Sequence, residues 1–409
     1  MDVTALCQEL GDVAEPHEPM ALEGLSVEAT LRPGDGDDLS RVLAILSERK
    51  LPVVVRGGGT RMGLGNPPRD ARLLLSTERL SGIEEFDAVD GVVRVRAGTP
   101  LSEIAKTVEA EGWELPLDPP GAAATLGGVV ATNATGPRVP RFGAPRRALL
   151  GLDVVLATGE PTSCGARVVK NVTGYDMAKL YAGSFGILGV ILAAWLRVRP
   201  KPRAVKTAVV AFEGRDLARS AGIAVAASRR ETARVAALVT GAPATELGAP
   251  PVSGGASALV VEYAGDEPAV ERDLARLLAE AGGREVAEES RLVGRLRDLQ
   301  ASGTVRARIA ALPSEVPRIL ESLSQAELGT ITYPDAGFVY AIGGDVAATG
   351  AIGEAAGGSD LLYEALPLDA RRERDVFGPA GAAGKIAASL KQRFDPAGIL
   401  NPGRFQGRL

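Results

Sequence analysis

Hydrophobic and polar residues follow two periods along the first part of the chain, and these periods predict alternating strands and helices. Leu51–Val55 is a short apolar run typical of a buried strand, whereas the apolar residues from Leu39 to Leu46 recur at helical spacing. With a strand from Ala29 and a Pro33-Gly34-Asp35 turn, they predict a β-α-β opening. A helix is also predicted over 100–111, and further strands at Arg72–Ser76, Val92–Ala97, Gly151–Ala157 and Ala193–Val198.

A second series of elements begins after Arg199-Pro200-Lys201-Pro202, a stretch expected to link two units. Helices predicted over 270–280 and 314–323 are interspersed with strands predicted at Thr207–Phe212, Val235–Val239, Ala258–Tyr263, Val305–Ala311, Gly329–Pro334 and Gly337–Ile342. This alternation is typical of an α+β unit. Residues 1–25 are predicted to form a short helix and a proline-rich lead-in.

A glycine-rich loop, Gly57-Gly58-Gly59-Thr60, follows the strand predicted at Leu51–Val55. Three consecutive glycines allow positive φ and leave main-chain N–H groups facing one point without Cβ atoms, which suits a diphosphate. The spacing fails the G-x-G-x-x-G test of a nicotinamide-binding turn, because Met62 stands five residues after Gly57. The alternative is a plain tight turn.

Small residues dominate the segment from Pro119 to Gly136, and hydroxyl or amide side chains recur at Thr125, Thr132, Asn133 and Thr135. Such a segment lets the backbone pass close to a flat, extended ligand and hydrogen-bond to it. The alternative is an Ala/Gly-rich packed loop that binds nothing.

Five motifs in this order resemble the FAD-binding domain of the vanillyl-alcohol-oxidase type. Within that superfamily they are most similar to the FAD-binding subunit of bacterial glycolate oxidase. The motifs are Gly57–Thr60, Pro119–Gly136, Lys170-Asn171-Val172-Thr173-Gly174-Tyr175-Asp176, Gly183–Ile191 and Leu390–Phe405. The resemblance implies an α+β fold, with a two-part FAD-binding domain and a smaller α+β cap domain. It divides the chain into an N-terminal lead (1–25), an FAD-binding domain (26–201), a cap domain (202–374) and a C-terminal segment that returns to the flavin domain (375–409).

The resemblance also implies which residues bind FAD. The glycine-rich loop would hold the diphosphate, the small-residue segment would line the flavin, and the Asn401 amide and the Arg404 guanidinium would approach the isoalloxazine ring. The alternative for Asn401-Pro402-Gly403 is a surface turn. The full set of expected residues is Gly57, Gly58, Gly59, Thr60, Pro119, Gly121, Thr125, Leu126, Gly127, Gly128, Thr132, Asn133, Gly136, Val190, Asn401 and Arg404. We expect non-covalent FAD, because Thr60 and Arg61 stand in the phosphate loop and Pro119–Gly136 contains no cysteine.

Charge and composition exclude several classes of protein. The chain has 409 residues and a formal net charge of −5, and its pI near 5.4 argues against a nucleic-acid binder. We expect no transmembrane segment and no signal peptide, because long apolar runs and a basic N-terminal region are missing. Cys7 and Cys164 are too few for a disulfide framework or an iron–sulfur cluster. We therefore expect a cytoplasmic protein, peripheral to the inner face of the membrane through partner subunits.

The resemblance implies oxidation of a small 2-hydroxy acid, glycolate, to glyoxylate, with hydride transfer to flavin N5 and electrons leaving through an iron–sulfur subunit. The only histidine, His17, lies between two prolines, where we expect a surface position. Neither a histidine base nor the metal site of related enzymes is therefore expected, and no catalytic residue is assigned. We expect a homologous FAD-binding catalytic subunit to carry the substrate chemistry, and the isolated chain to oxidise glycolate only slowly.

Two groups of residues could still act on a substrate. Arg308, with Arg306 on the same face of a predicted strand, is the best carboxylate clamp, although we prefer to interpret that face as exposed. A tyrosine could replace histidine as the base, and nothing favours one of Tyr263, Tyr333, Tyr340 and Tyr363. Two alternatives stay open: a stand-alone FAD-dependent dehydrogenase of another 2-hydroxy acid or alcohol, and a flavin-free structural subunit.

Overall fold

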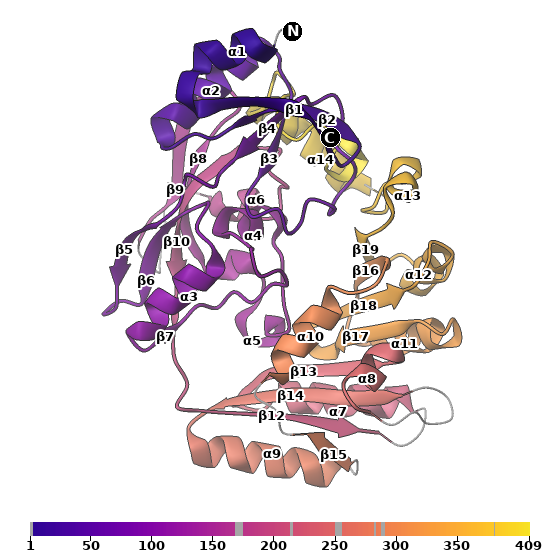
Figure 1. Cartoon of the computed structure of the whole chain (residues 1–409). Helices are drawn as coiled ribbons and strands as arrows, with labels where there is room; N and C mark the ends of the chain where they lie inside the picture. The colour runs from indigo at the N-terminus through magenta and orange to yellow at the C-terminus, as the bar shows by residue number, and fades with distance from the viewer. Residues whose placement is uncertain are drawn as a thin grey trace.

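The structure is a computed structural model that describes residues 3–167, 175–212, 216–249, 256–281, 284–287, 291–379 and 381–409. The described chain forms two units, which Figure 1 shows one above the other. The upper one contains two main sheets, and we call it the two-sheet unit; the lower one, the cap, contains a single eight-stranded sheet. Both chain termini lie at the two-sheet unit (Figure 1).

Two sheets of different kinds build the two-sheet unit. The first is mixed, with the strand order β1 (Ala14–Leu22), β2 (Leu25–Leu31), β4 (Leu73–Ser76), β3 (Val53–Arg56). The second is antiparallel, in the order β5 (Ile83–Asp87), β6 (Val92–Arg96), β10 (Val190–Arg197), β8 (Leu149–Val155), β9 (Pro161–Gly165). A two-stranded sheet pairs β7 (Trp113–Glu114) with β11 (Arg199–Pro200). The helices are α1 (Val3–Leu10), α2 (Gly36–Glu48), α3 (Leu101–Ala110), α4 (Leu126–Thr132), α5 (Val139–Phe142) and α6 (Ala178–Tyr181).

The β-α-β opening forms as predicted, because the local sequence determines each of its parts. Helix α2 begins after Asp35, whose side chain accepts a hydrogen bond from the Asp38 N–H at 2.9 Å. The apolar face of α2, including Leu39 and Leu43, is buried in the same core as β2, β3 and β4. This packing fixes the end of β3, from which the glycine-rich loop emerges.

The segment predicted as a proline-rich lead-in is instead strand β1, and that prediction is wrong. Pro16 and Pro19 are tolerated because β1 lies at the edge of its sheet and its pairing with β2 shifts register between Pro16 and Met20. His17 is half-buried in this strand, and its Nε2 lies 3.1 Å from Thr30 Oγ1. Residues 14–22 therefore belong to the first sheet.

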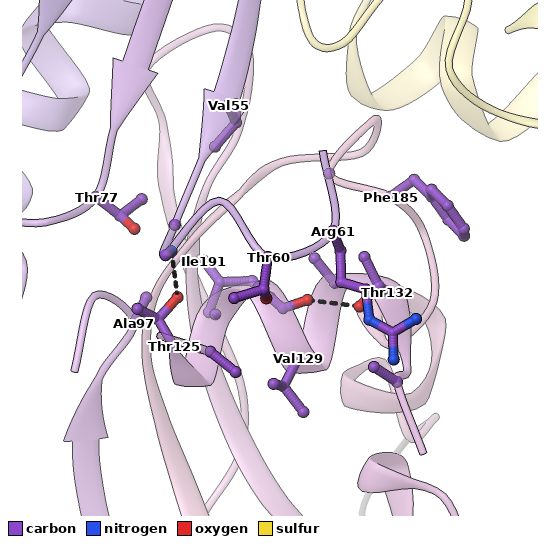
Figure 2. Close-up of a pocket in the computed structure, with 18 of the residues that line it drawn as sticks. Val55, Thr60, Arg61, Thr77, Ala97, Thr125, Val129, Thr132, Phe185 and Ile191 are labelled. Carbon is purple, nitrogen blue, oxygen red and sulfur yellow. Dashed lines mark hydrogen bonds between the residues drawn. The ribbon is translucent and has the colours of Figure 1, made fainter. Parts of the chain in front are cut away.

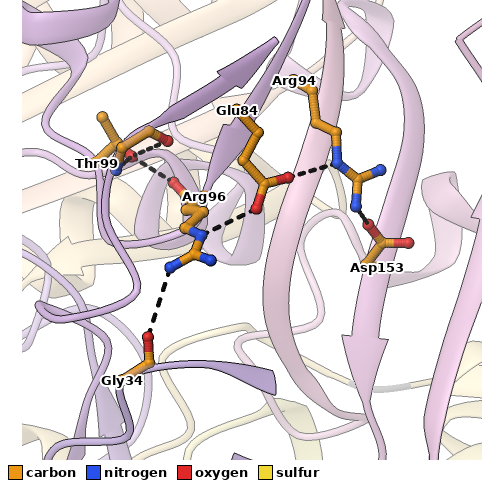
Figure 3. Close-up of polar contacts among 7 residues, drawn as sticks. Gly34, Glu84, Arg94, Arg96, Thr99 and Asp153 are labelled. Carbon is orange, nitrogen blue, oxygen red and sulfur yellow. Dashed lines mark hydrogen bonds and ion pairs between the residues drawn. The ribbon is translucent and has the colours of Figure 1, made fainter. Parts of the chain in front are cut away.

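Charged side chains connect the second sheet to the turn before α2 (Figure 3). Glu84 of β5 pairs with Arg94 at 2.5 Å and with Arg96 at 2.9 Å, both on β6. Arg94 also pairs with Asp153 of β8 at 2.5 Å, and Arg96 Nη1 donates to the Gly34 carbonyl at 3.5 Å. These contacts fix β6, and with it Ala97, which directly follows that strand.

The cap is one antiparallel sheet with helices on both faces. Its strand order is β15 (Arg284–Ala287), β12 (Ala204–Ala211), β14 (Ser257–Gly265), β13 (Ala233–Thr240), β17 (Gly329–Tyr333), β18 (Phe338–Gly343), β16 (Val305–Ala310), β19 (Asp360–Ala365). Along β12, Ala208 and Val210 join one core and Val209 and Ala211 the other, as the two-residue period requires. The first core contains α7 (Leu217–Ser228), α9 (Glu267–Ala281), α11 (Val316–Gln325) and α12 (Ala348–Ala356); the second contains α8 (Ala242–Glu246) and α10 (Leu292–Gln300).

After the cap, the chain passes through α13 (Leu368–Glu373) and returns to the two-sheet unit with α14 (Gly381–Phe394). Leu400 forms a parallel bridge with Val53 and so extends the first sheet beyond β3. Lys391 and Asp395 form a buried ion pair at 2.5 Å, and Lys391 also donates to the carbonyls of Ile187 and Leu400. The predicted return of the C-terminal segment is therefore observed.

One of the predicted motifs, Lys170-Asn171-Val172-Thr173-Gly174, lies outside the described residues. Among the helices that the structure does describe, none combines the length and the apolar character that a membrane span requires.

Candidate functional site

A pocket opens in the two-sheet unit between the glycine-rich loop after β3, helix α4 and the C-terminal segment (Figure 2). It brings together most of the residues predicted to bind FAD, although they come from four distant parts of the sequence. Those that line it are Gly57, Gly58, Gly59, Thr60, Pro119, Thr125, Gly127, Gly128, Thr132, Val190, Asn401 and Arg404. We call this cavity the flavin pocket, after the cofactor that these residues were predicted to bind.

Four of the predicted residues do not line the flavin pocket, because the fold uses them elsewhere. Leu126 is fully buried in the core behind α4. Asn133 ends α4 with a left-handed φ of 49°. A Cβ on Gly136 would lie 1.8 Å from the Asp118 carbonyl oxygen, so this glycine serves close backbone packing. Gly121 lines two neighbouring cavities instead.

The glycine-rich loop fits an anion, but only some of its main-chain N–H groups are free to donate a hydrogen bond to one. The Gly58 N–H donates to Thr125 Oγ1 at 3.1 Å, which corrects its predicted role as a free diphosphate donor. Among the described residues, the N–H groups of Gly57, Gly59 and Thr60 have no hydrogen-bond partner. Three such donors facing one cavity fit a diphosphate.

The glycine at position 58 is required by packing as well. A Cβ there would lie 1.6 Å from the Ala123 carbonyl oxygen. The substitution Gly58→Val would therefore displace the loop itself, and loss of flavin in that variant would not identify a flavin contact.

Within the small-residue segment predicted to pass close to a flat ligand, residues 126–132 form helix α4, which the sequence analysis did not predict. Leu126, Val129 and Val130 are buried at positions i, i+3 and i+4, and this apolar face outweighs the low helix propensity of Gly127 and Gly128. Packing explains the glycine at position 127, because a Cβ there would lie 2.8 Å from the Ala97 Cβ.

Asn401 and Arg404 both reach the flavin pocket, but in different ways. The Asn401 side chain accepts from the Val55 N–H at 2.8 Å and donates to the Phe185 carbonyl at 2.9 Å. Its amide is therefore occupied within the protein, and the predicted role of this amide at the isoalloxazine ring is not supported. The surface-turn alternative is also excluded, because Asn401 is 3% exposed.

Arg404 retains one nitrogen for a ligand. Its Nη2 donates to the carbonyls of Met62 and Leu64 at 2.9 and 2.6 Å. Its Nη1 is buried without a hydrogen-bond partner among the described residues. Burial lowers the pKa of Arg404 to about 10. An uncompensated buried cation with an unused donor fits an anionic or carbonyl-bearing group in the pocket.

A second cavity adjoins the flavin pocket on the side of the cap. Thr60, Arg61 and Pro120 line both cavities, and Arg306 and Glu364 of the cap complete the second one. Arg61 Nη1 donates to Glu364 Oε2 at 3.3 Å, and Nε of Arg306 lies 3.6 Å from the same oxygen. Arg308 Nε lies 3.7 Å from Glu364 Oε1. We call the Arg61, Arg306, Arg308 and Glu364 group the anion pocket.

Charge in the anion pocket is not balanced. Burial alone would raise the pKa of Glu364, but Arg61, Arg308 and Arg306 outweigh it and hold that pKa below its ordinary value. One ionised carboxylate thus faces three guanidinium groups, and the Arg306 Nε has no hydrogen-bond partner in the described chain. Arg306 is 7% exposed, so the preferred interpretation of this strand face as exposed is wrong. The surplus of positive charge fits a carboxylate ligand.

Neither cavity contains a clear general base. Tyr340, Tyr333 and Tyr363 are buried, and their hydroxyls bond to Thr135, Gln300 and the Thr349 carbonyl, respectively. Burial raises the pKa of Tyr340 to about 12. Tyr263 lies in the core of the cap. None of the four tyrosines is among the described lining residues of either cavity, and Glu364, with its lowered pKa, is a weak base.

Sequence reasoning missed several residues of the two cavities. Phe185, with a φ of 56°, and Gly186 line the flavin pocket, and only their place within the Gly183–Ile191 motif pointed to them. Phe185 packs against Phe377 and Phe405, with ring centroids 5.1 and 5.7 Å away. Glu364 gave no local signal, because its partner Arg61 is 303 positions away.

A metal centre finds no support in the part of the chain that the structure describes. That part contains no group of three or more His, Cys, Asp or Glu residues that could hold a metal ion.

Comparison with known families and proteins identifies the cofactor. Residues 27–165 match the family described as the FAD binding domain, which confirms the prediction of FAD. Glycolate oxidase subunit GlcD of Bacillus subtilis (strain 168) is 34% identical over 192 residues, 47% of this chain and 41% of that protein. Glycolate oxidase subunit GlcE of Escherichia coli (strain K12) is 39% identical over 157 residues, 38% of this chain and 44% of that protein. Mitochondrial D-2-hydroxyglutarate dehydrogenase of Bos taurus is 39% identical over 191 residues, 46% of this chain and 35% of that protein.

These matches confirm the predicted resemblance to glycolate oxidase subunits. The chain spans less than half the length of each of these curated relatives.

A solved structure shows that the fold extends beyond the matched domain. The crystal structure of p-cresol methylhydroxylase with substrate bound superposes with a TM-score of 0.70, at 16% identity, over 98% of this chain and 92% of that one. The likeness covers both units. It confirms the predicted α+β fold of the vanillyl-alcohol-oxidase type.

Proposed function

We propose that this chain, whose residues 27–165 match an FAD-binding domain, is the FAD-binding subunit of a glycolate oxidase complex that oxidises a 2-hydroxy acid. One observation carries the proposal: the flavin pocket adjoins a pocket with surplus positive charge and shares Thr60 and Arg61 with it. A 2-hydroxy acid offers a carboxylate beside the carbon to be oxidised, so the two cavities match the two ends of such a substrate.

Each cavity has a separate task in this proposal. FAD, when bound, supplies the acceptor for the hydride. The free N–H groups of Gly57, Gly59 and Thr60 would hold its diphosphate, and Arg404 Nη1 would meet a polar group of the cofactor. Arg61 and Arg306 would fix the substrate carboxylate. FAD would be non-covalent, because the described lining residues of the flavin pocket include neither histidine nor cysteine.

The proposal extends to other subunits, because two functions lack residues here. Proton removal from the substrate hydroxyl requires a base, and none was identified in the two cavities. We propose that a homologous FAD-binding catalytic subunit supplies this base at the anion pocket. Electron transfer through an iron–sulfur cluster requires several thiolates, whereas Cys7 and Cys164 are two scattered free cysteines. We therefore place the cluster on an iron–sulfur subunit.

Domain division and location complete the proposal. We divide the chain into 1–25, 26–201, 202–374 and 375–409; a cap sheet running from β12 to β19 supports the third part, whereas β1 joins the first part to the first sheet of the two-sheet unit. We place the protein in the cytoplasm, peripheral to the inner face of the membrane through its partner subunits.

The second candidate function is a stand-alone FAD-dependent dehydrogenase of another 2-hydroxy acid or alcohol. The anion pocket favours it, because a substrate site on this chain would be unnecessary if all binding occurred on a partner. Turnover by the isolated chain separates the two candidates.

The first experiment measures FAD binding by the purified chain. We expect a yellow protein that releases its flavin on acid denaturation. Arg404→Lys should weaken FAD binding about tenfold, because lysine keeps the charge but lacks the second guanidinium nitrogen. Arg408→Lys is the matched control, because Arg408 also donates to backbone carbonyls but does not line the flavin pocket. A chain that binds no FAD in a titration would support the flavin-free structural subunit instead.

The second experiment measures glycolate oxidation by the isolated, flavin-loaded chain with an artificial acceptor. We expect turnover well below about one per second, the lower part of the ordinary enzyme range. Faster turnover, lost in Arg61→Gln, would replace the complex-subunit proposal with the stand-alone dehydrogenase.

A further inference from the structure

A third cavity, remote from the flavin pocket, lies where the linker between the two units crosses α5. Six arginines line it, and four of them belong to the two-sheet unit: Arg141 of α5, Arg147 of the short helix Pro145–Arg147, Arg197 at the end of β10 and Arg199 of β11. We call it the arginine cleft. Arg141, Arg147 and Arg197 are exposed to solvent, and Arg199 is half-buried.

No carboxylate of the described chain neutralises these four arginines. None of them has an ion pair or a side-chain hydrogen bond to any described residue. The three acidic residues that line the cleft are paired with other cations. Asp90 pairs with Arg167 at 3.7 Å, Glu114 with Arg234 at 2.9 Å and Asp266 with Arg203 at 3.6 Å.

The arrangement costs electrostatic free energy and is nonetheless held in place. Burial lowers the pKa of Arg199, and repulsion from Arg141, Arg197 and Arg147 lowers it further, while attraction to Glu114 opposes the shift only in part. The Phe142 ring lies beneath two guanidinium groups, with its centroid 5.6 Å from Arg199 Cζ and 5.3 Å from Arg234 Cζ. This contact stabilises the Arg199 side chain, which lines the cleft. A concentration of unpaired cations is the pattern of an anion-binding surface.

The chemistry of the cleft favours an acidic polypeptide over other anions. Guanidinium groups match carboxylates in bidentate geometry, and three exposed arginines on separate elements suit several carboxylates spaced along a chain. A nucleic-acid surface would require a basic face on a basic protein, whereas this chain carries a net charge of −5. A small ligand would require a more enclosed site than one whose arginines are mostly exposed.

We propose that the arginine cleft binds an acidic segment of another polypeptide. The site is independent of FAD, so this proposal stands or falls separately from the proposed oxidation. A local surplus of positive charge also directs an acidic partner to that face.

The test compares binding of a fluorescent oligoglutamate peptide, by anisotropy at low salt, in flavin-loaded full-length variants. The cleft variant is Arg141→Gln combined with Arg197→Gln. The control is Arg219→Gln combined with Arg276→Gln, which removes the same charge from exposed positions on α7 and α9 of the cap. An oligoglutamine peptide of equal length measures uncharged binding, and circular dichroism checks that both variants are folded.

We expect the cleft variant to bind oligoglutamate at least about tenfold more weakly, and the control to stay within about twofold of the unsubstituted chain. Equal binding by both variants would overturn the proposal. Tighter binding of inorganic pyrophosphate, or of a single-stranded oligonucleotide, than of oligoglutamate at the cleft would also overturn it and assign the site to that anion.

Discussion

Asp118 is the residue whose protonation most clearly depends on its surroundings. Its Oδ2 accepts the Arg138 N–H at 2.9 Å, and its own carbonyl packs against Gly136. Burial raises the pKa of Asp118 to about 6, although Arg138 and Arg297 oppose the change. The folded chain therefore takes up a proton at a higher pH than the unfolded chain does. The ionised form costs stability at neutral pH, and this cost disappears as the pH falls through about 6 toward 4.

The substitution Asp118→Asn should remove this cost while keeping an oxygen for the Arg138 N–H. We expect the free energy of unfolding of the variant to exceed that of the unsubstituted chain by about 1 to 2 kcal/mol at pH 7.5. The difference should vanish below about pH 3, where the carboxyl is protonated in both states. Urea unfolding at the two pH values measures it. A stabilisation that grows as the pH falls would show that the carboxylate is the favoured form in the folded chain.

At the scale of elements, the C-terminal segment acts as an additional strand that positions the glycine-rich loop. Leu400 bridges Val53, and the Asn401 side chain connects the Val55 N–H to the Phe185 carbonyl. Asn401 adopts a left-handed φ of 46°, a conformation that glycine also adopts without strain. A substitution by glycine therefore removes the side-chain hydrogen bonds and leaves the backbone unstrained.

We expect Asn401→Gly to lower the free energy of unfolding by about 2 to 4 kcal/mol, because two buried backbone groups lose their partners. FAD binding should weaken as well. Asn133→Gly is the matched control, since Asn133 has a φ of 49° and makes one long contact, 3.4 Å from the Arg146 N–H. This control should change stability by less than about 1 kcal/mol and leave FAD binding intact. Loss of FAD in Asn133→Gly would restore the original prediction that Asn133 lines the flavin.

Local patterns in the sequence predicted a helix or strand correctly where the spacing of its apolar residues matches the face that is buried in the fold. Helix α2 and strands β2, β3 and β4 follow from apolar spacing alone. Strand β1 was missed because prolines normally argue against a strand, and only its edge position makes them acceptable. Helix α4 was missed because its glycines hide the buried positions Leu126, Val129 and Val130.

The candidate site, too, could be predicted from the sequence only in part. The glycine-rich loop and Arg404 belong to contiguous motifs, so the sequence alone pointed to them. The anion pocket depends on Arg61 and Glu364 meeting across two units, and no local pattern encodes that contact. Its charge balance follows from the three-dimensional arrangement alone.

At the scale of the whole molecule, one buried glutamate connects the two units. Glu262 of the cap accepts both Nε and Nη2 of Arg138, at 2.7 and 2.8 Å, and lies 3.1 Å from Arg234 Nε. Arg234 in turn pairs with Glu114 of the two-sheet unit at 2.9 Å. Burial would raise the pKa of Glu262, but Arg138 and Arg234 hold it below its ordinary value.

We expect Glu262→Gln to lower the free energy of unfolding by about 3 kcal/mol, because it leaves the half-buried Arg138 without its bidentate carboxylate and the buried Arg234 with Glu114 alone. Glu280→Gln is the control; Glu280 pairs with Arg230 at 2.6 Å, but its side chain is 55% exposed. That change should cost less than about 1 kcal/mol. Urea unfolding compares the two variants, and equal losses would show that the connection between the units contributes no more than a surface pair.

The bridge between Val53 and Leu400 also has a consequence for the order of synthesis. Val55 donates to Asn401, 346 positions further along the chain, so the loop after β3 receives this support only after residue 401 has left the ribosome. Until then the nascent chain contains every glycine of that loop but lacks Arg404. We expect FAD uptake to wait for this segment, and a product that stops short of residue 401 to lack both the Asn401 contacts and Arg404.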